Sequence, residues 1–398
     1  MDNGADMKIF WGSIFLWIIL FIVGLWLSMH KPLWCDELYG QKITVEGNSW
    51  GNILTGRIIE GNNFPLFFVL QKALMTVIHV DLPNDLAQDF ELPMEKRKYN
   101  RLLDPKGQIM IRLLPNVLMT TAIVCLVRFF LVRDGLVVAL MALLSALSSM
   151  MIWCYWDEAR PYSLWFLLTL LQALFLMKIL SGEFFSRRSK IYWTMINGFL
   201  ALAATMGFLQ VIIAQVILYF FGQRRLRDHG WAGILPVGAA LYLAFNRHSD
   251  PLFIAMDPID IIRSNFSYEQ VALLFFYLIA FFFRGAWSNR DVGLAYPSWK
   301  GIMQLPNLCS GFCLSVLILG FIHWHWHGDP KGIPVFGRHL FFLSALSMLM
   351  VPALFSDLWS NSKGKPFWRV VFGGVFILVL FSQLIEGFTN GWFGGFFS

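Results

Sequence analysis

The chain has 398 residues, of which 57% are hydrophobic and only 14% are charged. Its mean hydropathy of +0.60 implies more apolar surface than a water-soluble fold can bury, so the composition predicts an integral membrane protein. The net charge of +6 does not indicate nucleic acid binding, because the basic residues are scattered between apolar runs and form no basic domain. We therefore expect membrane lipids, and no nucleic acid, among its partners.

Apolar runs of spanning length recur along the chain, and a membrane-spanning helix needs about 20 mostly apolar residues. The first run, Ile9 to Met29, is followed by no small-residue cleavage site, so we expect a retained helix with a cytoplasmic N-terminal tail. Further spans are expected at 108–131, 134–153, 161–180, 191–207, 208–222, 231–246, 269–283, 304–322, 338–356 and 367–388. The predicted fold class is all-α integral membrane, with about eleven spans in a single polytopic domain, 1–398.

The stretch from Phe64 to Val80 is short for a span and carries Gln71, Lys72 and His79. We expect it to lie in the membrane interface as an amphipathic helix of a first extracytoplasmic loop, residues 30–107. With this choice, the short segments predicted inside hold many more lysines and arginines than those predicted outside, as the positive-inside rule requires. The basic cluster at 96–101 is the evidence against it, because a spanning Phe64 to Val80 would place that cluster in the cytoplasm.

Two acidic motifs follow predicted helix ends. Asp36 and Glu37 lie within Trp34 to Tyr39, just after the first span. One interpretation is a solvated helix start, since carboxylates favour the first turn of a helix. The other is a general base, because aromatic neighbours can desolvate a carboxylate and raise its pKa towards a useful value.

The second motif runs from Trp156 to Tyr162 and contains Asp157, Glu158 and Arg160 ahead of Pro161, a residue suited to the first position of a helix. A cap with an interfacial ion pair would explain it, but ionisable residues at a membrane boundary are costly and indicate a functional site. If Phe64 to Val80 lies in the interface, the chain crosses the membrane an even number of times between the two acidic motifs. Both motifs are then expected on the same face.

Arginines are expected at that face as well: Arg112, Arg160, and Arg338 with His339. Each could extend to lipid headgroups as an anchor, or together they could bind a phosphate, for which guanidinium geometry is suited. His323, His325 and His327 alternate with tryptophans, which favours an interfacial aromatic belt over a metal site. We expect no cofactor and leave a divalent metal open.

In these motifs the chain resembles the C-type polytopic glycosyltransferases, particularly the branch with the protein O-mannosyltransferases and the aminoarabinose transferase of lipid A. The resemblance rests on the acidic pair after the first helix, Pro65-Leu66, Arg-Leu-Leu-Pro from Arg112, Glu158 to Tyr162, and more weakly Phe336 to Leu340. Asn63-Phe64-Pro65 stands where the family has His-Pro-Pro, and no large soluble domain is present.

The resemblance implies an inverting transferase of the plasma (inner) membrane that uses a polyprenyl-phosphate sugar and faces the periplasm or exterior. It assigns residues 108–222 to a catalytic module and 231–398 to C-terminal helices. Asp36 resembles the catalytic base and Glu37 its neighbour. Contacts with the donor phosphate or the substrate are expected from Arg112, Asp157, Glu158, Arg160, Tyr162, Arg338 and His339. The acceptor, a lipid, glycan or protein, stays open.

Two rival functions remain. A transporter or flippase of a lipid-linked or anionic substrate could use Gln210 and Gln215, which lie within an apolar run and could line a path. Such proteins usually show related halves and interrupted helices, and the sequence shows no convincing halves. A non-catalytic membrane scaffold would leave the clustered acids and arginines unexplained.

Overall fold

The computed structural model describes residues 3–58, 65–78, 100–101, 105–180, 187–204, 207–221, 238, 241, 268–283 and 342–389. The predicted spans at 231–246 and 304–322 fall outside these residues, apart from positions 238 and 241. So do Arg338, His339, the three alternating histidines and the basic residues at 96–98.

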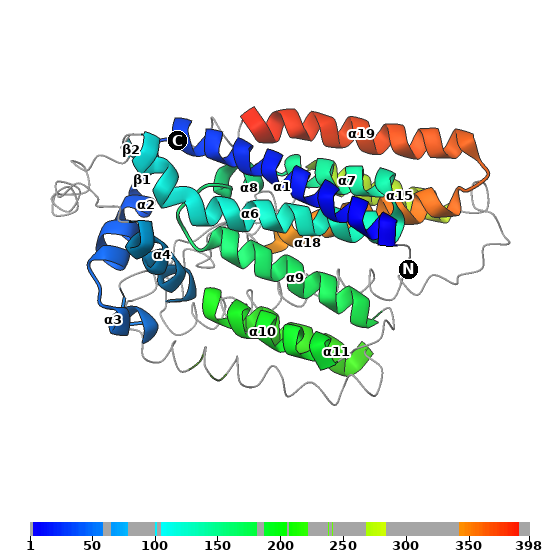
Figure 1. Ribbon diagram of the computed structural model, residues 1–398. Coiled ribbons are helices and arrows are strands. Elements are labelled where there is room, and N and C mark those ends of the chain that lie inside the picture. The colour runs from blue at the N-terminus through cyan, green and yellow to red at the C-terminus, as the bar shows by residue number, and fades with distance from the viewer. Residues whose placement is uncertain are drawn as a thin grey trace, which may run out of the picture.

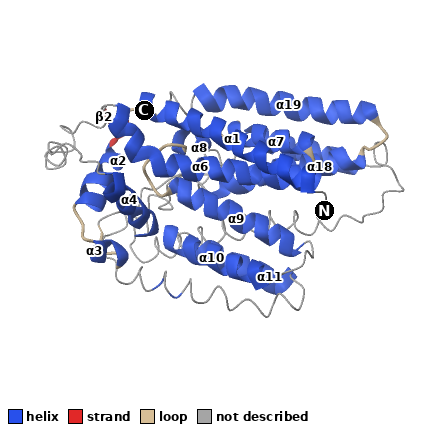
Figure 2. Cartoon of the chain, viewed as in Figure 1, coloured by secondary structure: helices blue, strands red, loops and turns tan. Residues whose placement is uncertain are grey.

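Nearly all of the described chain is helical, as Figure 2 shows. The long helices are α1 (Asn3–His30), α6 (Pro105–Asp134), α7 (Leu136–Leu147), α9 (Tyr162–Leu180), α10 (Arg187–Ala203), α11 (Gly207–Phe221), α15 (Tyr268–Phe282), α18 (Phe342–Asn361) and α19 (Pro366–Phe388). The short elements are β1 (Leu33–Trp34), α2 (Cys35–Tyr39), the π-helix η1 (Gly40–Glu46), α3 (Trp50–Leu54), α4 (Pro65–Ile78), β2 (Asn100–Arg101) and α8 (Met150–Tyr155). The long helices form one bundle, and α2, α3, α4 and both strands gather at one end of it (Figure 1).

Within the described residues, four helices are long and apolar enough to cross a membrane: Met7–His30, Pro105–Asp134, Tyr162–Ile179 and Pro366–Glu386. The membrane character of the chain is thereby supported, whereas the count of about eleven spans stays a prediction. Helix α4 is among the shorter apolar helices, and its placement along a membrane interface also stays a prediction.

The expected continuous span at 134–153 is wrong, because two helices occupy this segment. Helix α7 begins after Gly135, whose φ of 89° suits glycine. It ends at Leu147, and the hydroxyl of the following residue, Ser148, donates to the Ser145 carbonyl over 3.0 Å. The indole of Trp153, on α8, then donates to the Leu147 carbonyl over 2.6 Å. These side chains satisfy carbonyls at the end of α7, so the chain can change direction without exposing them.

Helices α1 and α6 pack closely because Gly24 has no side chain. Asn116 of α6 lies against this glycine, donates to the Phe21 carbonyl over 3.2 Å and accepts from the Trp156 indole over 3.1 Å. A Cβ atom added at Gly24 would lie 1.8 Å from the Asn116 oxygen. The close approach brings the end of α1 against the turn between α8 and α9, where the candidate site lies.

Gly24→Ala should therefore lower stability, by about 1–3 kcal/mol, because an inserted methyl group forces a well-packed interior apart. Gly12→Ala is the matched control on the same helix, since a Cβ there would meet nothing within 4 Å. Thermal unfolding of the purified variants in detergent measures both effects. Equal unfolding midpoints for the two variants would contradict this packing.

Candidate functional site

The two acidic motifs meet at the end of the bundle where α1 ends and α6 begins (Figure 1). The Ala159 backbone amide donates to Glu37 Oε1 over 2.8 Å, and the Arg160 guanidinium reaches Asp36. The short strand pair β1–β2, in which Leu33 pairs with Arg101, closes the same end. The expectation that both motifs share one face is therefore confirmed.

Glu37 is almost completely buried, and both of its carboxylate oxygens accept two hydrogen bonds. Arg112 holds it in a bidentate pair, with Nε 2.9 Å from Oε1 and Nη2 2.6 Å from Oε2. The Trp34 amide also donates to Oε2 over 3.0 Å, which ties the start of α2 as in a capping box. Burial raises the pKa of Glu37, but the charge and hydrogen bonds of Arg112 outweigh it, so the pKa lies below its ordinary value.

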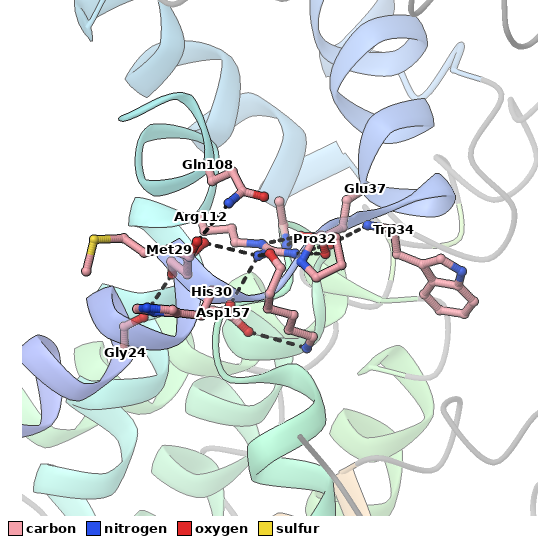
Figure 3. Close-up of polar contacts among 12 residues, drawn as sticks. Gly24, Met29, His30, Pro32, Trp34, Glu37, Gln108, Arg112 and Asp157 are labelled. Atoms are coloured by element: carbon pink, nitrogen blue, oxygen red, sulfur yellow. Dashed lines mark hydrogen bonds and ion pairs between the residues drawn. The ribbon is translucent and has the colours of Figure 1, made fainter. Parts of the chain in front are cut away.

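Arg112 lies in the interior of the protein, so it is not the anchor extended to lipid headgroups that was one of the two interpretations from the sequence. Its side chain is fully buried, and beyond Glu37 it donates to the carbonyls of Ser28, Lys31 and Pro32. These carbonyls lie at and just beyond the end of α1, where a helix leaves acceptors unpaired. Figure 3 shows the Arg112 side chain next to Pro32, Glu37 and Asp157. In this geometry Arg112 joins α2 and α6 to the end of α1. Contact with a donor phosphate would require its hydrogen bonds to Glu37 and to these carbonyls to be broken.

Lys31 and Asp157 extend the same set of charges. Asp157 is fully buried, with Oδ2 3.4 Å from Arg112 Nη1 and Oδ1 3.4 Å from Lys31 Nζ. Lys31 also donates to the Cys154 carbonyl over 2.6 Å. We refer to Glu37, Arg112, Asp157 and Lys31 as the buried ion chain. It joins α1, α2, α6 and the turn that leads into α9.

Asp36 is the partly accessible acid of this cluster. Its side chain is 30% exposed, and Arg160 lies beside it, with Nη2 3.8 Å from Oδ2 and Nη1 3.3 Å from the Asp36 carbonyl. The neighbouring Trp34 is also exposed. An accessible carboxylate next to a guanidinium can remain ionised and accept a proton from a bound molecule.

Glu158 has quite different surroundings, although it follows Asp157 directly in sequence. It is 4% exposed, and its Oε1 has no hydrogen-bond partner among the described residues. Burial, followed by the negative charge of Glu37, raises the pKa of Glu158 to about 8. The sequence assigned Asp157 and Glu158 one shared role, whereas the structure separates an ion-paired acid from an acid held neutral.

Tyr162, also expected at the site, opens α9 and is buried, with its ring 4.5 Å from that of Tyr155. Sequence reasoning missed two residues that hold the site together, Lys31 and Gln108. Lys31 could have been noticed as the first cation after the first apolar run. Gln108 donates to the Met29 carbonyl over 3.0 Å (Figure 3), and nothing in its sequence context indicated this.

Within the described residues, no group of three or more histidine, cysteine, aspartate or glutamate side chains could hold a metal ion. Apart from Glu158, the acids and cations described above form ion pairs with one another. The arrangement can therefore supply proton acceptors, proton donors and hydrogen bonds from the protein's own side chains.

Arg112→Gln should destabilise the protein by about 3–5 kcal/mol, because it leaves Glu37 buried without its cation and Asp157 with Lys31 alone. The matched control is Arg128→Gln, since Arg128 lies on the same helix but is exposed. Thermal unfolding midpoints at neutral pH compare the two. A midpoint for Arg112→Gln as high as that of Arg128→Gln would show that the buried pair contributes little.

Comparison with known proteins identifies no family for the chain. No family model matches the chain, and no curated protein is similar to it in sequence.

Proposed function

We propose that the chain is a membrane glycosyltransferase that moves a sugar from a polyprenyl-phosphate donor to an acceptor on the extracytoplasmic face, with Asp36 as the base. The observation that carries the proposal is the contrast among the clustered acids. Glu37 and Asp157 are buried in ion pairs, whereas Asp36 is 30% exposed beside Arg160. A base that meets an incoming acceptor needs this accessibility.

In this reaction Asp36 takes the proton of an acceptor hydroxyl. The hydroxyl oxygen attacks the anomeric carbon of the donor sugar from the side opposite the phosphate, which inverts the configuration. The Arg160 guanidinium lies beside this carboxylate, with Nη2 3.8 Å from Oδ2. The buried ion chain contacts no reacting atom in this scheme, and its residues are positioning residues.

The orientation of the site is supported by charge at the other end of the bundle. Arg133 lies at the end of α6, and Lys363 and Lys365 lie in the turn between α18 and α19. Figure 1 places this turn and the N-terminus of α1, with Lys8, away from α2. Cations concentrate on the cytoplasmic side of membrane proteins, so the acidic site is on the extracytoplasmic side in our proposal.

The donor phosphate needs cations that are not enclosed by protein groups. Arg112 is not suited to this role, because its donors point to Glu37, Asp157 and backbone carbonyls. Arg160 is 7% exposed, but it lies beside the partly exposed Asp36, with Nη2 3.8 Å from Oδ2. Arg338 and His339 fall outside the described residues. Their contact with the donor, which the family resemblance implies, remains part of the proposal.

Of the two glutamines that suggested a transport path, Gln215 has no hydrogen-bond partner for its side-chain amide among the described residues, whereas Gln210 has a structural explanation. Gln210 accepts from the Trp165 indole over 2.5 Å and donates to the Thr169 hydroxyl over 3.1 Å. Both partners lie on α9, and hydrogen bonds of this kind join membrane helices. A transporter therefore gains no support from Gln210.

Asp36→Asn should reduce transfer by about 10²- to 10⁴-fold, because the amide keeps the size of the side chain but cannot accept the proton. The thermal unfolding midpoint should stay close to that of the unchanged protein, since Asp36 is partly exposed. The assay follows a labelled sugar from polyprenyl-phosphate donors, with purified protein in detergent or lipid.

Glu46→Gln serves as the control, because Glu46 pairs with Lys42 near the same face but outside the acidic cluster. It should transfer sugar at the normal rate. Normal transfer by Asp36→Asn would remove Asp36 from the mechanism. No turnover of any polyprenyl-phosphate sugar by the unchanged protein would overturn the proposed function.

A further inference from the structure

Among the described acids of the cluster, Glu158 is the one whose carboxylate the structure leaves unused. Glu37 and Asp157 bind the cations of the buried ion chain, and Asp36 contacts Arg160. Glu158 is 4% exposed, and its Oε1 lacks a hydrogen-bond partner among the described residues. A buried polar atom without a partner is costly, which makes such an atom a candidate for contact with a bound molecule.

Charged and titratable groups from every neighbouring element act on Glu158. They are Lys31 after α1, Asp36 and Glu37 on α2, Arg112 on α6, Cys154 on α8, and Arg160 before α9. The cations in this set already have carboxylate partners, so they cannot compensate Glu158 fully. Burial and the charge of Glu37 accordingly raise the pKa of Glu158 to about 8, whereas the pKa of Glu37 is lowered. Carboxyl groups whose environments separate them in this way commonly divide the acid and base roles of an active site.

We propose that Glu158 is the general acid of the transfer and protonates the phosphate oxygen that leaves the anomeric carbon. This inference rests on the proposed function, and it goes beyond the contact with donor phosphate or substrate that the family resemblance implies for Glu158. A phosphate departing into this site gains negative charge where the cations are already paired. A neutral carboxylic acid can stabilise that charge without an unpaired cation.

The step balances in atoms and electrons. The bond between the anomeric carbon and the phosphate oxygen breaks, and its electron pair stays on that oxygen, which takes the Glu158 proton. The acceptor oxygen forms the new bond to the anomeric carbon, and its proton passes to Asp36. Asp36 then loses its proton to water and Glu158 regains one, which restores the starting state.

The two proton transfers assist each other electrostatically. The negative charge of Asp36 is among the causes that raise the pKa of Glu158. When Asp36 takes the acceptor proton, this charge disappears and Glu158 becomes a stronger acid. The site thus donates its proton most readily at the moment when the phosphate departs.

The rate should depend on pH in a definite direction. Glu158 is active when protonated, so kcat should fall as the pH rises through the Glu158 pKa of about 8. The decline should approach about tenfold per pH unit above that value, as for a single titrating group. A kcat that stays level up to pH 9.5 in the unchanged protein would overturn the inference even if no variant were made.

Glu158→Gln tests the residue itself. The amide keeps the size and can donate a hydrogen bond but no proton, so kcat should fall by about 10²-fold or more and the alkaline decline should disappear. Because a neutral amide replaces a neutral acid, the unfolding midpoint should change little. Glu158→Asp should restore part of the rate and the alkaline decline, which a merely structural role would not predict.

The outcomes separate this inference from the proposed function. If the unchanged protein transfers sugar and Glu158→Gln transfers it equally well, or keeps the alkaline decline, Glu158 is not the acid and the proposed function stands. If the unchanged protein turns over no polyprenyl-phosphate sugar, the proposed function itself fails. Glu46→Gln is again the control and should keep both the rate and the pH profile.

Discussion

The buried ion pair between Glu37 and Arg112 is the interaction on which the rest of this site depends. Two long apolar helices, α1 and α6, can pack through hydrophobic contacts, but such contacts do not fix where the polar segments beyond their ends lie. Arg112 does so, because it binds Glu37 on α2, Asp157 before α9 and the carbonyls after α1. Charges buried away from water are tolerated only when ion pairs and hydrogen bonds satisfy them. Conformations that lose one of these contacts are therefore strongly disfavoured.

This constraint gives three neighbouring acids three different states. Glu37 is held ionised by Arg112, Asp36 reaches solvent beside Arg160, and Glu158 is left buried with a raised pKa. The fixed charge of Glu37 contributes to that raised pKa, so the positioning pair also tunes the proposed acid. The proposed base and acid thus depend on a pair that takes no part in the reaction.

Much of this could be predicted from the sequence, because apolar runs and charge placement report on helices and faces. The first span, the meeting of the two acidic motifs and the candidate Asp36 came from such patterns. The break at Ser148 was missed, since hydropathy does not register how Trp153 satisfies the carbonyls of α7. The burial of Arg112 was missed for a related reason, because local sequence cannot show which carbonyls a side chain will meet.

A double-mutant cycle with Glu37→Gln, Arg112→Gln and both together, read out as unfolding midpoint and as sugar transfer, tests the central claim most directly. Each single variant should be destabilised by about 3–5 kcal/mol, because it leaves a buried charge without its partner. Each should also transfer less sugar. The double variant should recover much of the stability, since two amides can pair and Asp157 keeps its ion pair with Lys31. Transfer should recover in part, because Asp36 is retained but the charge of Glu37 no longer raises the pKa of Glu158. Additive losses of stability, or a stable double variant that transfers no more sugar than the single variants, would contradict the claim that the pair holds the site in position.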